Sequence, residues 1–242
     1  MTKLPAHPDP ATGSGEREQR DLRSYGRRRG RRPSARQAAL WQETLPRLAL
    51  DLAQAPGDLA ALFAAPVADI WLEIGFGGAE HLLWQAAHHA GVGLIGCEPF
   101  QDGVVKVLRA IAEQAIGNIR LHADDARAVL RWLPDASIGR AFILFPDPWP
   151  KARHQKRRIV SEATLEDLAR AMRPAAELRI ATDIGDYAAW ILRAVRRQAG
   201  FRWTAEGPSD WRTRGADWPP TRYEQKALAE GRRCYYFRFQ RL

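Results

Sequence analysis

The feature that most constrains the fold of this chain is a regular alternation between short apolar runs and amphipathic stretches. The apolar runs predict strands at residues 70–74, 93–97, 119–122 and 141–145, and residues with helical periodicity lie between them. Strands that alternate with helices form parallel sheets, because the chain must cross back over the sheet before the next strand begins. The sequence therefore predicts an α/β fold with a doubly wound, Rossmann-like sheet.

Two amphipathic stripes support this prediction, because each one puts its apolar residues on a single helix face. They are formed by Val104, Val105, Leu108, Ile111 and Ala112, and by Tyr187, Trp190, Ile191, Ala194 and Val195. The second stripe follows a fifth predicted strand at 178–181. The last apolar segments, near 201–204 and 235–239, have no obvious long helix between them. They predict an antiparallel closing pair of strands on a mostly parallel sheet.

The charge of the chain is strongly basic. Its 37 Lys and Arg residues outnumber its 28 Asp and Glu residues, which gives a formal net charge of +9. Such an excess favours a polyanionic partner, although charge alone does not choose between nucleic acid and an anionic membrane. No apolar run approaches the roughly 20 residues that cross a bilayer, so we expect a cytoplasmic protein that is not embedded in a membrane.

The basic residues begin in an N-terminal segment that differs from the rest of the chain. Residues 1–36 are rich in Gly, Pro, Ser and Arg and cannot bury a core, so we expect a disordered extension. Residues 37–242 are expected to form one domain. The two cysteines, Cys97 and Cys234, provide neither a disulfide framework nor the spacing of a zinc site, so we predict no metal centre.

A glycine-rich turn follows the first predicted strand and opens a helix. Gly75 and Gly77 let the backbone approach a ligand closely, and Glu73 stands at the entrance of the turn. A dinucleotide site would need a third glycine at position 80, where Glu80 would repel a pyrophosphate. A cationic ligand such as S-adenosylmethionine, which carries a sulfonium and an ammonium, fits these acids better.

Further acids end the next two predicted strands. Glu98 lies where a carboxylate can accept hydrogen bonds from the two hydroxyl groups of a ribose. Asp124 and Asp125 follow the third strand, where either could contact an adenine or could simply cap the next helix. These positions extend the predicted cofactor site, and the choice between the two aspartates stays open.

The fourth predicted strand runs into a rigid acidic turn. Asp147 lies between two prolines, and Trp149, which follows them, could pack on a base. A basic run comes next, consisting of Lys151, Arg153, His154, Gln155, Lys156, Arg157 and Arg158. Either feature alone could be an ordinary turn or a solvated face. Together they predict a fixed carboxylate beside a surface that binds RNA.

At this point the sequence resembles the bacterial tRNA (guanine-N7)-methyltransferases, from about residue 23 to the C-terminus. The matching motifs are Leu72-Glu-Ile-Gly-Phe-Gly77, Gly96-Cys-Glu98, Asp125-Ala126, the segment 145–160, Ala181-Thr-Asp183 and Thr221-Arg-Tyr-Glu224. The resemblance implies a methyltransferase-type Rossmann-like fold and the transfer of a methyl group from S-adenosyl-L-methionine to N7 of guanine 46 in the variable loop of tRNA. No obligate protein partner is evident.

The resemblance also implies roles for individual residues. Glu73, Glu98, Asp125 and Asp147 would line the cofactor site, and residues 153–158 would contact RNA. The substrate would be bound by Lys151, Asp183, Thr221, Arg222, Tyr223 and Glu224. Taken without the resemblance, Asp183 would be read as a helix cap and residues 221–224 as a capping turn.

Guanine N7 carries a free lone pair, so its methylation needs alignment and no general base. Asp147 is therefore expected to position the base and to stabilise its new positive charge. Two alternatives stay open. The motif around Asp147 is similar to that of N6-adenine methyltransferases, which would make this an exocyclic-amine enzyme. The chain could also be a non-catalytic RNA-binding protein that retains a methyltransferase fold.

Overall fold

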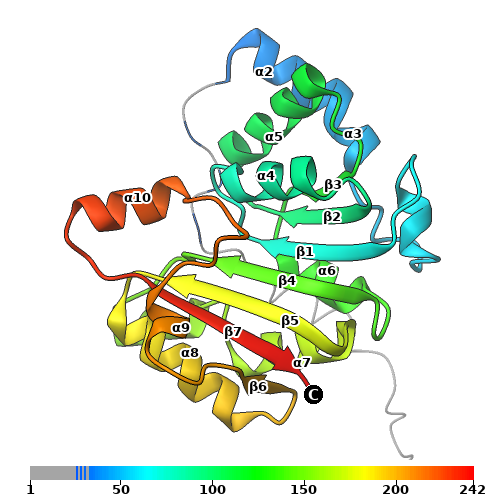
Figure 1. Ribbon diagram of the computed structural model, residues 1–242. Coiled ribbons are helices and arrows are strands. Elements are labelled where there is room, and N and C mark those ends of the chain that lie inside the picture. Colours follow the sequence, from blue (N-terminus) through cyan, green and yellow to red (C-terminus); the bar gives the residue numbers. More distant parts are fainter. Residues whose placement is uncertain (1–25, 27, 29, 31–32) are drawn as a thin grey trace, which may run out of the picture.

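The computed structural model describes residues 26, 28, 30 and 33–242, and these form a seven-stranded sheet with helices on both faces (Figure 1). The strands are β1 (Asp69–Ile74), β2 (Val92–Cys97), β3 (Ile119–His122), β4 (Ile138–Leu144), β5 (Met172–Thr182), β6 (Phe201–Trp203) and β7 (Tyr235–Arg241). Their order in the sheet is β3-β2-β1-β4-β5-β7-β6. The predicted Rossmann-like α/β fold is confirmed.

The strand pairing agrees with the predicted mixture of directions. The pairs β1·β2, β2·β3, β1·β4 and β4·β5 are parallel, whereas β7 is antiparallel to both β5 and β6. The last strand therefore inserts between two earlier ones. The strand order reverses between β1 and β4, the place where doubly wound sheets bind ligands beyond the carboxyl ends of their strands.

The helices connect the strands and cover the sheet. The α-helices are α2 (Ala35–Ala39), α3 (Leu45–Leu48), α4 (Glu80–His88), α5 (Gln101–Gln114), α6 (Ala126–Trp132), α7 (Glu162–Ala171), α8 (Gly185–Arg197), α9 (Ser209–Arg212) and α10 (Arg222–Ala229). A π-helical turn lies at η1 (Leu40–Thr44), and 3₁₀ turns lie at η2 (Leu59–Leu62) and η3 (Ala152–Arg157).

The core has two layers, because alternate residues of a strand point to opposite faces of the sheet. Ile70, Leu72 and Ile74 of β1 pack in one apolar cluster with residues of α6, α7 and α8. Trp71 belongs to the other cluster, with residues of α4 and α5 such as Leu82. Both predicted helical stripes lie on helices, α5 and α8, and bury their apolar faces on opposite sides of the sheet, except for Ala112, which is exposed.

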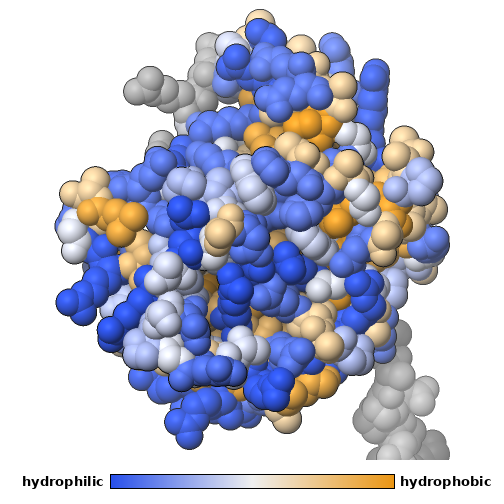
Figure 2. Space-filling model, in the orientation of Figure 1, coloured by the Kyte–Doolittle hydropathy of each residue, from blue (hydrophilic) through white to orange (hydrophobic). Residues whose placement is uncertain are grey.

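The connection between the two closing strands contains more helix than the sequence suggested. The short α9 and the eight-residue α10 lie between β6 and β7. Helix α10 projects from the sheet beside the ends of β1 and β4 (Figure 1). This face of the molecule is largely hydrophilic with several separate apolar spots, one of which lies over α10, the helix that carries the exposed Leu228 (Figure 2).

Most of the predicted N-terminal extension lies outside the described residues. Within the described part, helix α2 starts at Ala35, where Ser34 caps it in a capping box with Gln37. Arg28 forms an ion pair with Asp124 at 2.6 Å, and its carbonyl accepts a hydrogen bond from the N–H of Gln101. Across the described ranges, no helix combines the length and apolar character that crossing a bilayer requires.

Candidate active site

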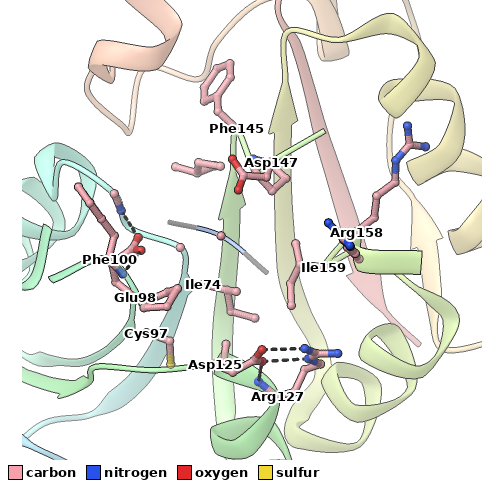
Figure 3. Close-up of a pocket in the computed structure, with 18 of the residues that line it drawn as sticks. Ile74, Cys97, Glu98, Phe100, Asp125, Arg127, Phe145, Asp147, Arg158 and Ile159 are labelled. Carbon is pink, nitrogen blue, oxygen red and sulfur yellow. Dashed lines mark hydrogen bonds and ion pairs between the residues drawn. The ribbon is translucent and has the colours of Figure 1, made fainter. Parts of the chain in front are cut away.

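A cavity of about 410 Å³ opens at the carboxyl ends of β1, β2 and β4, beside the point where the strand order reverses (Figure 3). Its walls come from the glycine turn after β1, the residues after β2 and β3, and the segment that follows β4. The lining also includes Arg157, Arg158 and Ile159, together with Tyr223 of helix α10. Such a volume is typical of sites for small molecules and cofactors. Five of the six residues predicted to bind the cofactor line this cavity: Gly75, Gly77, Glu98, Asp125 and Asp147.

The glycine turn is shaped by backbone conformations that few other residues adopt. Gly75 and Gly77 have φ values of 75° and 51°, in the left-handed region where glycine avoids a steric penalty. The turn also packs closely on helix α5. A Cβ added to Gly103 would lie 2.3 Å from the carbonyl oxygen of Gly77, so only glycine fits there. The close packing of helix α5 therefore helps to fix the position of the turn.

Glu98 connects this turn to the end of β2. Its Oε2 accepts a hydrogen bond from the N–H of Gly77 at 2.6 Å, and its Oε1 accepts one from the N–H of Phe100 at 2.9 Å. Burial raises the pKa of the Glu98 carboxyl, and this effect outweighs the two backbone hydrogen bonds, which lower the pKa. The carboxylate is thus fixed in orientation and still lines the cavity.

The structure does not bring Glu73 into the lining of the cavity. The residue is 3% exposed, and its Oε2 lies 2.7 Å from Nδ1 of His81 in the first turn of α4. The other ring nitrogen of His81 lies 3.0 Å from Nε2 of Gln85. The carboxylate of Glu73 therefore joins β1 to α4 beneath the glycine turn, and the structure gives it no direct access to a ligand.

Asp125, and not Asp124, turns towards the cavity. Its side chain caps α6 through the N–H of Arg127 and also binds the Arg127 guanidinium at 2.7 and 2.9 Å. Burial raises the pKa of Asp125, but the hydrogen bonds from Arg127 outweigh burial and lower it overall. The helix-capping alternative thus holds for Asp125, which lines the cavity as well, whereas Asp124 pairs with Arg28.

Asp147 lies across the cavity from Glu98 (Figure 3). Phe145 and Trp149 on either side of it have φ values of 50° and 43°. Positive φ is costly for residues with a Cβ atom and occurs where surrounding contacts impose it, often at functional sites. The partly buried position of the Asp147 carboxyl raises its pKa. The turn therefore holds an acid in a strained and well-defined place.

The basic run after Asp147 forms the 3₁₀ turn η3. Lys151, Arg153 and Lys156 are exposed, as expected for residues that contact RNA, and the guanidinium of Arg157 lies 5.1 Å from the centre of the Trp149 ring. His154 and Gln155 are half-buried in the same turn. Lys151 precedes η3 and does not line the cavity.

Arg158 departs from the predicted RNA-binding role. Its side chain is fully buried, and it forms an ion pair with Asp186 at 2.6 Å. A residue that is shielded in this way cannot contact a phosphate without a rearrangement. The sequence placed Arg158 with its exposed neighbours because it belongs to the same basic run, but the chain turns inward at the end of η3.

Two of the predicted substrate-binding regions are engaged within the protein. Asp183 forms an ion pair with Arg232 and does not cap α8. Thr221 caps α10 by accepting a hydrogen bond from the N–H of Glu224. The Glu224 carboxylate is buried and binds the hydroxyl group of Tyr236 at 2.5 Å. The capping alternative therefore describes Thr221 and Glu224, although it fails for Asp183.

The residues between Thr221 and Glu224 point outward. Tyr223 is 44% exposed, and its ring lies over Gly77, where an added Cβ would meet it at 2.9 Å. Arg222 donates a hydrogen bond to the Tyr223 hydroxyl group at 3.0 Å and lies over its ring. Tyr223 thus contributes an aromatic ring to the lining of the cavity, next to the glycine turn.

Three residues of this site were not predicted from the sequence: His81, Phe100 and Arg127. The pairing of Arg127 could have been predicted from the sequence, because an aspartate that caps a helix can form an ion pair with an arginine two residues later. Phe100 contributes a backbone N–H, which no side-chain pattern reveals. Among the described residues, no cluster of His, Cys, Asp and Glu is arranged to hold a metal ion.

Comparison with known proteins gives three results. Residues 67–237 match a family model described as "Putative methyltransferase". The chain is 50% identical to a tRNA (guanine-N(7)-)-methyltransferase of Rhodospirillum rubrum over 93% of its length and 90% of the relative's. It is 49% identical to the enzyme of that name from Brucella melitensis over 90% of this chain and 94% of the relative's. Among solved structures, the antibiotic-resistance methyltransferase Kmr matches at 19% identity over 80% of this chain and 94% of that one, with a TM-score of 0.49.

Proposed function

Because the chain belongs to the tRNA (guanine-N(7)-)-methyltransferase family, we propose that it takes a methyl group from S-adenosyl-L-methionine and adds it to guanine 46 in the variable loop of tRNA. The observation that carries the proposal is the pair of acids, Glu98 and Asp147, on opposite walls of one cavity at the switch point of the sheet. Glu98 suits the binding of the cofactor, and Asp147 suits the base that accepts the methyl group.

The cofactor half of the cavity has properties that suit S-adenosylmethionine. The Glu98 carboxylate is fixed by two backbone N–H groups, and each of its oxygens retains a lone pair for a ribose hydroxyl group. Gly75 leaves space at the turn, because an added Cβ there would meet no atom within 4 Å. When bound, this cofactor supplies a methyl group on a cationic sulfonium. Glu98, Asp125 and the glycine turn would hold it, while Glu73 would act through His81 and the turn.

The role of Asp147 follows from the charge that appears on guanine. The base becomes cationic when N7 is methylated, and no proton has to be removed. A carboxylate at ~4 Å from a unit positive charge contributes a gross attraction of about 4 kcal/mol at an effective dielectric constant near 20. Part of this attraction already exists before the reaction, so Asp147 contributes by position and by charge and does not act as a base.

On the tRNA side, the candidates differ in accessibility. Lys151, Arg153 and Lys156 are exposed beside the cavity and suit phosphate contacts. Tyr223 presents an aromatic face to the cavity, and stacking on such a face is a common way to hold an unpaired base. Asp183, Thr221 and Glu224 are bound within the protein, so we assign direct substrate contact in the segment 221–224 to Arg222 and Tyr223.

The organisation of the chain is part of the same proposal. Residues 37–242 would form the catalytic domain, and residues 1–36 would add a basic segment that attracts tRNA. Work on tRNA is consistent with the cytoplasmic location expected from the sequence.

The test is to incubate the protein with tRNA that lacks modifications and with S-adenosylmethionine labelled in its methyl group, and then to identify the labelled nucleoside. The proposal predicts label in 7-methylguanosine. Label on an exocyclic amine would support the N6-adenine-type alternative. If calorimetry detects no binding of S-adenosylmethionine, the chain is a non-catalytic RNA-binding protein.

A further inference from the structure

Arg158 is the residue of the basic run whose position differs most from that of its neighbours. Its side chain is fully buried, whereas Lys151, Arg153 and Lys156 are exposed. The guanidinium lies 4.7 Å from the centre of the Tyr187 ring and 4.9 Å from that of Trp190, both on α8. Burying a charge in such surroundings is costly unless it is paired, so this position implies a role inside the protein.

The guanidinium connects two elements that the sheet does not join. Its Nε–H donates a hydrogen bond to the carbonyl oxygen of Pro148 at 2.8 Å, and its Nη2 donates one to Asp186 at 2.6 Å. Pro148 is the residue that follows Asp147, and Asp186 lies in the first turn of α8. One side chain therefore fastens the acidic turn to a helix that packs on the sheet.

Helix α8 also holds the segment that carries Arg158. Nε1 of Trp190 donates a hydrogen bond to the carbonyl oxygen of Val160 at 2.7 Å, and the hydroxyl group of Tyr187 accepts one from the N–H of Val160 at 3.4 Å. Val160 lies two residues beyond Arg158 and is itself buried. Helix α8 thus holds the backbone near Arg158 as well as the guanidinium group at the end of its side chain.

We propose that Arg158 is a positioning residue for methyl transfer, which holds Asp147 at the methyl acceptor by fastening the Pro148 carbonyl to helix α8. The positive φ of Trp149, at 43°, shows that the turn adopts a conformation that needs support from outside. Lysine cannot replace this contact, because its single ammonium group lacks the planar fork that binds two acceptors while it stacks on rings. The inference rests on the proposed role of Asp147 in the transfer.

The test compares Arg158→Lys and Arg158→Met with Arg193→Ala, a matched control that removes an exposed arginine of α8. Both Arg158 variants should lower kcat at saturating tRNA by about 10- to 100-fold, the loss expected when a reacting group moves by about 1 Å. Their Kd values for tRNA and for S-adenosylmethionine should stay within about twofold of the wild type. Lys156→Ala should instead raise the Kd for tRNA and reduce its salt dependence by about 0.7 to 0.9 log units.

A second readout does not depend on activity. Hydrogen exchange at the amide of Phe145, whose N–H donates a hydrogen bond to the carbonyl oxygen of Ala181 at the start of the turn, should be faster in Arg158→Lys, with no change at the amides of β4. If Arg158→Met does not fold, Asp186→Asn gives the same comparison, with a smaller loss of kcat. A weakened Kd for tRNA with normal kcat in Arg158→Lys would overturn the inference. If the wild type does not methylate tRNA, the proposed function fails, whereas the exchange result still tests the fastening of the turn.

Discussion

The carboxylate of Glu98 accepts a hydrogen bond of 2.6 Å from the backbone N–H of Gly77, 21 residues earlier in the chain. This contact joins the end of β2 to the glycine turn that follows β1. A second oxygen of the same carboxylate binds the N–H of Phe100, at the start of α5. One buried acid therefore organises three backbone segments around the cofactor half of the cavity.

Substitution Glu98→Gln should weaken the binding of S-adenosylmethionine. An amide keeps the shape of the carboxylate, but its NH₂ end cannot accept a hydrogen bond, so the N–H of Gly77 or of Phe100 loses its partner. Hydrogen bonds to charged groups contribute about 1.5–3 kcal/mol, which corresponds to roughly a 10- to 100-fold increase in Kd measured by calorimetry. Glu113→Gln is the control, since it removes an exposed acid at the other end of α5. Equal Kd values in both variants would contradict the assignment.

As the pH decreases, the affinity for S-adenosylmethionine should begin to fall at a higher pH than it would if Glu98 had the pKa of an ordinary carboxyl group. Burial raises the pKa of Glu98, so its proton is taken up earlier as the pH decreases, and the acceptor for the ribose is lost. The effect of this raised pKa on the stability of the free protein has the opposite sign. A carboxyl group whose pKa is raised by folding stabilises the fold at pH values below the pKa of the unfolded chain. That stability is lost as the pH rises through the pKa of the folded protein. The measurement is the Kd of S-adenosylmethionine against pH. An unchanged profile in Glu98→Gln would exclude Glu98 as the titrating group.

Removing the ring of Tyr223 should raise the KM for tRNA by about tenfold, because stacking of a base on an aromatic side chain contributes roughly 1–3 kcal/mol. The variant Tyr223→Ala tests this directly, and Tyr223→Phe, which keeps the ring, should behave like the wild type. Leu228→Ala is a suitable control, since Leu228 is 55% exposed on the same helix and does not line the cavity. A loss as large in Tyr223→Phe would assign the effect to the hydroxyl group and its contact with Arg222.

The variant Thr221→Ala should affect stability more than activity. Losing the cap of a helix costs about 0.5–2 kcal/mol, which can be measured by denaturant unfolding. Thr221→Ser, which keeps the hydroxyl group, should restore the stability. Steady-state kinetics at a temperature where both variants are folded should give a KM for tRNA close to the wild-type value. A large increase in KM without loss of stability would show that Thr221 contacts the substrate.

The strands and the two long amphipathic helices could be predicted because they depend on local pattern, whereas α9 and α10 were not expected. The predicted strand at 70–74 differs from β1 by one residue, and the antiparallel closing pair was expected from the absence of a long helix. Phe145 was assigned to the end of a strand, but its φ of 50° takes it out of the sheet. A local pattern does not reveal such a turn, because tertiary contacts impose it.

The positions of acids at strand ends could be predicted, but their partners could not. Glu73 and His81 meet because α4 packs over β1, and Glu224 meets Tyr236 because α10 packs against the start of β7. A motif gives the residue type at a position, whereas the packing of other elements decides whether its side chain faces a ligand or the protein. Arg158 is the clearest case, since it ends an exposed basic run and is itself fully buried.

The most direct test of the account measures the modified nucleosides in two tRNA transcripts, one with guanine and one with adenine at position 46, after incubation with S-adenosylmethionine. We expect 7-methylguanosine only from the first transcript. The variant Asp147→Asn should form it at least about 100-fold more slowly, while binding tRNA normally. Formation of 7-methylguanosine from both transcripts, or of a nucleoside methylated at another atom, would contradict the central claim.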